Sequence, residues 1–219
     1  MITVLTQKNS VANQFLAQLR DAVVQQDRMR FRRNLERLGE IFAYEISKTL
    51  TYQPQEVETP LGIATCHTLV DQPVLATILR AGLPLHQGLL NIFDEAGTCF
   101  IAAARHTKKS GEFEIHKSYV NTPNLDEKVV IMADPMLATG QSIVICCKDL
   151  LVDYNVKELH IVIAIASDEG VQYVRKYLPE AHLWIGEIDN ELTSKSYIVP
   201  GLGDAGDLAF GGKDKGEHA

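Results

Sequence analysis

The sequence predicts an α/β fold built on a mainly parallel sheet flanked by helices. From about residue 70 onward, short apolar runs alternate with segments that have the length and apolar spacing of helices. Runs such as VLATIL (74–79) are almost continuously apolar, which is typical of parallel strands buried on both faces. The chain has 219 residues, of which 46% are hydrophobic and 22% charged, so it can bury a sizeable core.

The first 50 residues are expected to form a helical N-terminal extension. Asn9 or Ser10 can cap the first helix, because their side-chain oxygens accept hydrogen bonds from the first turn. The apolar face of this helix consists of Val11, Phe15, Leu16 and Leu19. A second helix has apolar residues at helical spacing: Phe31, Leu35, Leu38, Phe42 and Ile46.

A β-hairpin arm and a series of alternating strands and helices complete the predicted fold. The arm spans 55–67, with residues of alternating type on either side of a Thr-Pro-Leu-Gly turn. Strands are expected at 74–79, 98–104, 128–133, 159–166 and 182–185. Helices are expected at 83–93, 141–154 and 168–177. This order implies βαβ units, and ligands in such sheets bind beyond the carboxyl ends of the strands.

The composition narrows the function classes. A net charge of −7 argues against nucleic-acid binding, which needs a basic face. No apolar run is long enough for a membrane helix, and the N-terminus lacks a signal-peptide pattern, so a cytoplasmic protein is expected. The four cysteines have no CxxC spacing, and no metal site is assigned to the protein. The whole chain, 1–219, is expected to be one domain, with 211–219 as a frayed tail.

The most informative segment follows the strand at 128–133. It reads Asp134-Pro-Met-Leu-Ala-Thr-Gly-Gln-Ser142 and leads into the next helix. A glycine and small hydroxyl residues at a helix N-terminus can bind a phosphate through free amides and the helix dipole. Asp134 would repel a phosphate but can accept hydrogen bonds from sugar hydroxyls. The segment therefore indicates a sugar-phosphate site, and an ordinary capped loop is the alternative.

Two arginines follow other strands. Arg80-Ala81-Gly82 can offer a guanidinium and bare amides to a phosphate group, with glycine allowing positive φ and close backbone approach. Alternatively, Arg80 caps carbonyls in a simple turn. Arg105 precedes a segment with Lys108, Lys109 and Gly111, which indicates a basic hairpin tip that could close over a polyanion. A solvated loop is the alternative.

The C-terminal stretch Tyr197-Ile-Val-Pro-Gly-Leu-Gly-Asp-Ala-Gly-Asp207 is rich in glycine but also carries bulky apolar residues. It predicts an ordered, non-helical loop whose backbone groups could pair with the edge of a flat heterocycle. A glycine-rich linker is the alternative. Sequences typical of a Walker nucleotide site, a GxGxxG dinucleotide site or a GxSxG hydrolase are absent.

These three segments, in this order, resemble the uracil phosphoribosyltransferases among the type I phosphoribosyltransferases. The 134–142 segment resembles the family's ribose-phosphate loop. The family's pyrophosphate loop is resembled by Ile78-Leu-Arg-Ala-Gly-Leu83, and its uracil-binding segment is resembled by 197–207. The resemblance covers about 55–211. It implies a type I phosphoribosyltransferase core with N-terminal helices, a β-hairpin arm and a C-terminal base-binding hood.

The resemblance implies a role for each matched residue. Arg80 and Arg105 would bind the diphosphate of 5-phosphoribosyl 1-diphosphate (PRPP), and these two with Asp204 are the expected catalytic residues. PRPP would also contact Asp134, Pro135, Met136, Leu137, Ala138, Thr139, Gly140, Gln141, Ser142 and Asp204. Uracil would meet Ile198, Gly203, Asp204 and Ala205. Mg²⁺ is expected on the diphosphate, held mainly by substrate oxygens and water.

The implied reaction converts uracil and PRPP to UMP and diphosphate, as in pyrimidine salvage. The resemblance also implies a homo-oligomer that is a dimer or larger. Two positions depart from the family pattern: Gln141 stands where a second glycine is usual, and 106–111 replaces an acidic stretch. GTP binding, a family property, is therefore assigned to no residue here. The alternatives are a phosphoribosyltransferase for another base, a non-catalytic nucleotide-sensing regulator, and an α/β scaffold that binds neither substrate.

Overall fold

The computed structural model describes residues 1–107 and 113–212, with the side chains of all of these except 103–107 and 113–118. Its main sheet has the strand order β1-β10-β9-β7-β4-β5-β6. The strands are β1 (Ile2–Val4), β10 (His182–Asp189), β9 (Glu158–Ser167), β7 (Val129–Ala133), β4 (Val74–Leu79), β5 (Gly97–Thr107) and β6 (Phe113–Asn121). All neighbouring pairs along this order are parallel except β5 and β6, and the short β8 (Met136–Leu137) pairs with β9. The predicted α/β fold with a mainly parallel sheet is confirmed.

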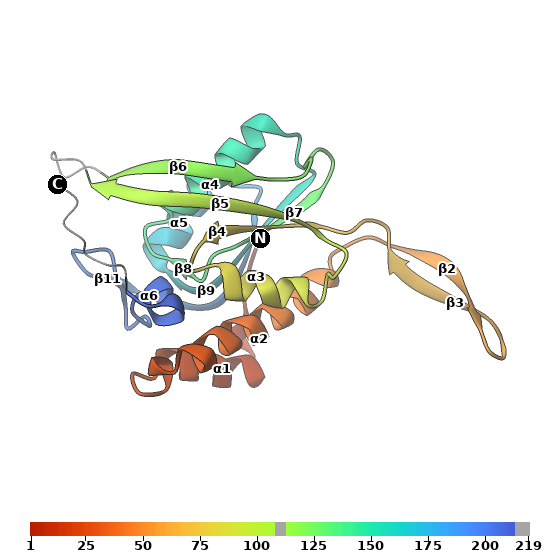
Figure 1. Cartoon of the computed structure of the whole chain (residues 1–219), viewed down its shortest axis with the longest axis horizontal. Helices are drawn as coiled ribbons and strands as arrows, with labels where there is room; N and C mark the ends of the chain where they lie inside the picture. Colours follow the sequence, from red (N-terminus) through yellow and green to blue (C-terminus); the bar gives the residue numbers. More distant parts are fainter. Residues whose placement is uncertain (108–112, 213–219) are drawn as a thin grey trace.

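Helices cover both faces of the sheet (Figure 1). They are α1 (Val11–Arg20), α2 (Arg28–Ser47), α3 (Leu83–Leu90), α4 (Gln141–Asp153) and α5 (Asp168–Tyr177). Side chains alternate between two cores, because successive strand residues point to opposite faces. On β4, Ala76 belongs to the core under α4 and α5, whereas Leu75 belongs to the core under α1, α2 and α3.

The N-terminal helices form where the apolar spacing predicts them. Ser10, rather than Asn9, caps α1, and a reciprocal bond with Asn13 completes a capping box. Two short 3₁₀ turns, η1 (Leu5–Gln7) and η2 (Val24–Gln26), flank α1. Within the described residues, none of the helices is both long and apolar enough to cross a membrane.

The predicted arm is the hairpin of β2 (Tyr52–Thr59) and β3 (Gly62–Leu69), which projects from the body of the molecule (Figure 1). All eight residues of β2 are exposed, and Leu61 at the tip is 100% exposed. An isolated two-stranded hairpin is only marginally stable in water. Because the arm is exposed, no other described part of the chain covers its apolar side chains.

Several elements differ from the expectations. β10 runs to Asp189, four residues past the predicted strand end at 185, because its last residues pair with the second half of β9. Three small elements lie near the C-terminus: β11 (Glu191–Leu192), β12 (Ile198–Val199) and α6 (Ala205–Phe210). Gly211, the predicted start of the tail, is held by the hydrogen bond from its N–H to the Asp207 carbonyl. Residues 213–219 of that tail lie outside the described part of the chain.

Candidate active site

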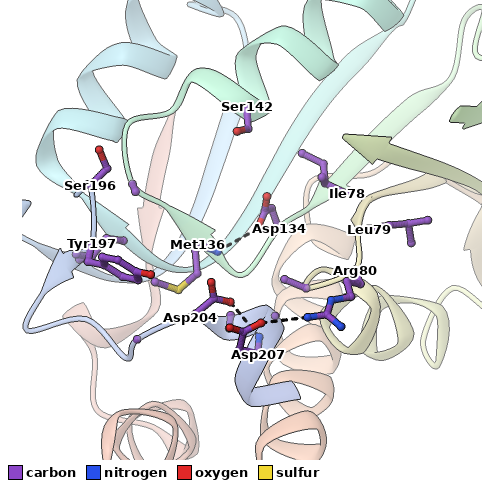
Figure 2. A pocket seen from close by; sticks show the side chains of 16 residues that line it. Ile78, Leu79, Arg80, Asp134, Met136, Ser142, Ser196, Tyr197, Asp204 and Asp207 are labelled. Atoms are coloured by element: carbon purple, nitrogen blue, oxygen red, sulfur yellow. Dashed lines mark hydrogen bonds and ion pairs between the residues drawn. The ribbon is translucent and has the colours of Figure 1, made fainter. Parts of the chain in front are cut away.

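One cavity of about 360 Å³ lies beyond the carboxyl ends of β4 and β7, where the rule for parallel sheets puts a ligand site. Three separate parts of the chain line it (Figure 2). The lining residues are Ile78, Leu79, Arg80, Ala81, Asp134, Met136, Ala138, Ser142, Ser196, Tyr197, Ile198, Gly203, Asp204, Ala205, Gly206 and Asp207. The structure thus brings all three motif segments together around one space.

The 134–142 segment is a tight loop between β7 and α4. Asp134 directly follows β7, and its Oδ1 accepts a hydrogen bond from the Met136 N–H at 3.2 Å. Gly140 is the N-cap of α4 with φ of +77°, a conformation that glycine adopts without strain. Gln141 is the first residue of α4 and is exposed, so glycine is not required at that position.

Only part of this loop faces the cavity with its side chains. Asp134, Met136, Ala138 and Ser142 line the space. Leu137 is instead 1% exposed and belongs to the core under α4 and α5. The remaining predicted members, Pro135, Thr139, Gly140 and Gln141, are not among the lining residues. A PRPP contact of these residues remains a prediction.

Arg80 lies just after β4 and is held by the C-terminal segment. Its Nη2 donates to Asp207 Oδ1 at 3.1 Å and to the Gly211 carbonyl at 2.8 Å. Gly82 has φ of −72°, so it does not use the positive φ that glycine permits. Close packing inside the protein accounts for the glycine, because a Cβ at Gly82 would collide with Thr77 Oγ1 and lie 2.7 Å from the Ala133 carbonyl oxygen. Approach of this backbone to a phosphate stays a prediction.

The C-terminal segment folds over the cavity as a short hairpin followed by a helix. β12 pairs with β11, and Gly201 and Gly203 both have positive φ. Asp204 is the N-cap of α6, and its Oδ1 accepts from the Asp207 N–H at 3.0 Å. The expectation that no helix forms here is wrong from Ala205 onward, because the Asp204 cap stabilises α6 although this helix contains Gly206.

The cavity is rich in carboxylates. Asp134, Asp204 and Asp207 line it, and Arg80 is the one lining cation among residues whose side chains are described. Arg105 lies on β5, but its side chain falls outside the described part, as do Lys108, Lys109 and Gly111. Within the described residues, no group of three or more potential metal ligands exists.

Several lining residues were not assigned a role from the sequence. Tyr197, Gly206 and Asp207 lie in the C-terminal stretch. Its glycines indicate a binding loop as a whole but do not distinguish these three residues. Ala81 follows the predicted Arg80, whereas no sequence signal indicated Ser196. The side chain of Tyr197 is half exposed and lies on the same side of the cavity as Met136 (Figure 2).

The described histidines lie elsewhere. His86 and His160 are buried, and burial lowers the pKa of His86 below its ordinary value. Burial, together with the neighbouring His182, lowers the pKa of His160 to about 4. No histidine is among the lining residues, with the side chains of His106 and His116 outside the described part.

Comparisons with known proteins agree with this geometry. The family model for uracil phosphoribosyltransferase matches residues 5–212. A uracil phosphoribosyltransferase from Porphyromonas gingivalis is 50% identical over 207 residues, 94% of this chain and 96% of that protein. Another from Thermococcus gammatolerans is 38% identical over 90% of this chain and 88% of that protein.

A solved structure extends the agreement to the fold. The AQ2163 protein from Aquifex aeolicus superimposes with a TM-score of 0.86 at 30% identity, covering 96% of this chain and 98% of that one. The fold is therefore that of the type I phosphoribosyltransferases, and the matched region includes every segment that lines the cavity. The chain belongs to the uracil phosphoribosyltransferase family.

Proposed function

We propose that this protein transfers the 5-phosphoribosyl group of PRPP to uracil and releases UMP and diphosphate. The observation that carries the proposal is that the 134–142 loop and the 197–207 segment line one cavity. A sugar phosphate on the first and a pyrimidine on the second would then meet within a single nucleotide. Membership of the family supports the same substrates.

The loop after β7 would bind the ribose 5′-phosphate. Asp134 accepts hydrogen bonds from the ribose hydroxyls, while residues 138–142 surround the phosphate. The N-cap Gly140 has no side chain that bonds to the first turn of α4. The amides of that turn are suited to an anion, which the positive end of the helix dipole also favours.

Arg80 and Arg105 would bind the diphosphate. A charge argument supports a Mg²⁺ ion there, because the cavity carboxylates would otherwise repel a polyanionic substrate. The oxygens of Asp134 and Asp204 are the hard ligands that Mg²⁺ accepts, directly or through water, with the diphosphate supplying others. Bound Mg²⁺ neutralises the charge that develops on the leaving diphosphate.

Backbone groups would select the base. Ile198 and Gly203–Ala205 line the cavity and offer amides and carbonyls to the edge of uracil. The ring of Tyr197 provides a flat surface against which a base can stack. Cytosine would leave some of these groups unpaired, and such losses allow strong discrimination.

The chemical step breaks the bond between C1′ and the diphosphate oxygen and forms the bond between C1′ and N1 of uracil. The N1 proton leaves to diphosphate or solvent, so no histidine is required. As the leaving group departs, C1′ gains positive charge and diphosphate gains negative charge. Arg80 stabilises the latter, while the cavity holds the two reactants in line.

A homo-oligomer and a cytoplasmic setting complete the proposal. The exposed hairpin arm, with Leu61 and Ile63 at 100% and 72% exposure, would gain stability by packing on another copy of the chain. Light scattering after gel filtration tests this. The double variant Leu61→Asp, Ile63→Asp should have a lower molecular mass in solution than the parent, because the arm no longer holds the copies together. All four cysteines are free thiols, as is usual in the cytoplasm.

The test is an assay for UMP and diphosphate from uracil, PRPP and Mg²⁺, read by chromatography. Parallel reactions contain cytosine or hypoxanthine in place of uracil. The proposal expects product with uracil at a rate far above the rate with either other base, and a loss of product when a chelator removes Mg²⁺. Turnover of another base would support a different specificity, and UMP binding without turnover would support a regulator.

A further inference from the structure

A charged pair outside the cavity holds the base-binding segment. Arg20 is the last residue of α1, and Asp189 is the last residue of β10. The two form a double hydrogen bond, from Nη1 to Oδ2 and from Nη2 to Oδ1, each at 2.8 Å. Asp189 is 7% exposed and the Arg20 side chain 20% exposed, so this contact is partly shielded from water.

Both residues also bond to the backbone of Gly201. Arg20 Nη1 donates to the Gly201 carbonyl at 2.9 Å, and the Gly201 N–H donates to Asp189 Oδ2 at 2.9 Å. One ion pair thus satisfies the donor and the acceptor of a single buried residue. A buried peptide group with both partners supplied this way has little freedom to shift.

Gly201 lies between residues that face the cavity. Ile198 precedes it by three positions, Gly203 follows it by two, and both line the cavity. Gly201 has φ of +56°, and a Cβ there would collide with the carbonyl oxygen of Ile198. The turn is therefore fixed at Gly201, and its conformation determines where the flanking backbone groups point.

We infer that Arg20 and Asp189 are positioning residues that set the base-binding backbone in register with uracil. The inference rests on the proposed function, because it assigns this backbone to the base. The guanidinium supplies a fork that matches the carboxylate and has a donor left for Gly201. Lysine at position 20 would keep the charge but lose the fork.

A purely structural role is the competing explanation. Breaking a buried ion pair destabilises a protein whatever lies next to it, so loss of activity alone would not separate the two roles. The distinguishing measurement is the choice between bases. Misplaced backbone groups should weaken uracil binding and selectivity, whereas lower stability should affect both substrates alike.

The experiment uses the full chain and the variants Arg20→Lys and Asp189→Asn. Glu187→Gln is the matched control, since Glu187 lies 3.6 Å from Arg20 Nη2 and is more exposed than Asp189. Val174→Ala, in the core under α4 and α5, is the control for general destabilisation. Each protein is assayed for KM and kcat with uracil, PRPP and cytosine, and its Tm is recorded.

For both positioning variants we expect the KM for uracil to rise about tenfold and the preference for uracil over cytosine to fall similarly. The KM for PRPP should stay within about twofold of the parent value. The KM and kcat values of both control variants should do the same. Equal changes for both substrates, or unchanged constants for uracil, would overturn the inference. If Asp189→Asn fails to fold, the kinetic constants of Arg20→Lys alone test the inference. A parent chain that forms no UMP would refute the proposed function instead.

Discussion

Arg80 Nη2 lies 3.1 Å from Asp207 Oδ1, so the residue after β4 is paired with the first turn of α6. Both side chains line the cavity, at 38% and 45% exposure. A diphosphate bound by Arg80 would replace Asp207 as its partner. Through this contact the C-terminal helix α6 touches the residue that is proposed to bind the leaving diphosphate.

Replacing Arg80 by alanine should lower kcat/KM for PRPP by about 10²–10³, because a donor aimed at developing charge acts mainly in the transition state. The Tm should change little, since exposed ion pairs contribute about 1 kcal/mol or less. Steady-state kinetics and calorimetry measure the two effects. Asp207→Asn is the companion variant and should leave the KM for PRPP equal or lower. Parental turnover in Arg80→Ala would remove Arg80 from the site.

Asp204 caps α6 and also lines the cavity, so the role in catalysis proposed for it can be tested apart from its role in the helix. Asn caps a helix about as well as Asp, so Asp204→Asn should keep the Tm and reduce the rate of ribosyl transfer. Asp204→Ala should reduce the rate and also cost about 1 kcal/mol of stability through the lost cap. Thermal unfolding and UMP formation test the pair. If Asp204→Asn retains full activity, the residue serves only the helix.

Substitutions at Gly140 and at its neighbour Gln141 should differ in their effect on PRPP binding. Gly140→Ala forces a Cβ onto a φ of +77° and to 2.9 Å from the Gly170 carbonyl oxygen, so it should lower the Tm and raise the KM for PRPP. Gln141→Gly should cost about 1 kcal/mol or less of stability and bring no gain in PRPP binding. Calorimetry and PRPP titrations provide the comparison. Tighter PRPP binding by Gln141→Gly would mean that the loop itself needs a second glycine.

The sequence predicts the central strands well for a physical reason. The run at 74–79 coincides with β4, because a strand buried on both faces ends where polar residues begin. The end of β10 lacks such a boundary, since Glu187 and Asp189 are polar residues within the strand. With a predicted end at 185, Asp189 is not among the residues expected at the strand end.

The candidate site could be predicted as far as its segments. Those at Arg80 and 134–142 follow strands whose ends parallel topology brings together, whereas the 197–207 segment is indicated by its glycines alone. The contact between Arg20 and Asp189 could not be predicted, since 169 positions separate them and neither stands in a local pattern. The helix α6 was missed because Gly206 within it and the glycines before it argue against a helix, whereas the capping bond of Asp204 favours one. A long-range ion pair in the first case and a local capping bond in the second, rather than periodicity, determine these features.

His160 gives the stability a dependence on pH. The ring is buried, and its Nδ1 accepts from the Trp184 indole N–H at 3.0 Å. Burial first, and the nearby His182 second, lower its pKa to about 4, although Glu158 acts in the opposite direction. An unfolded histidine has a pKa of about 6.5. Between these values the unfolded chain binds more protons, so stability falls as the pH falls from about 6.5 towards 4.

His160→Asn should reduce this dependence, because the Asn side-chain oxygen can accept from Trp184 and does not titrate. The expected difference in slope is at most about 1.4 kcal/mol per pH unit, and buried His86, whose pKa is also lowered, keeps a residual slope in the variant. Unfolding by urea at pH 7, 6 and 5 measures it. The exposed His67 on the arm provides the control variant His67→Asn, which should follow the parent. Equal slopes for the parent and His160→Asn would show that His160 does not cause the loss of stability in acid.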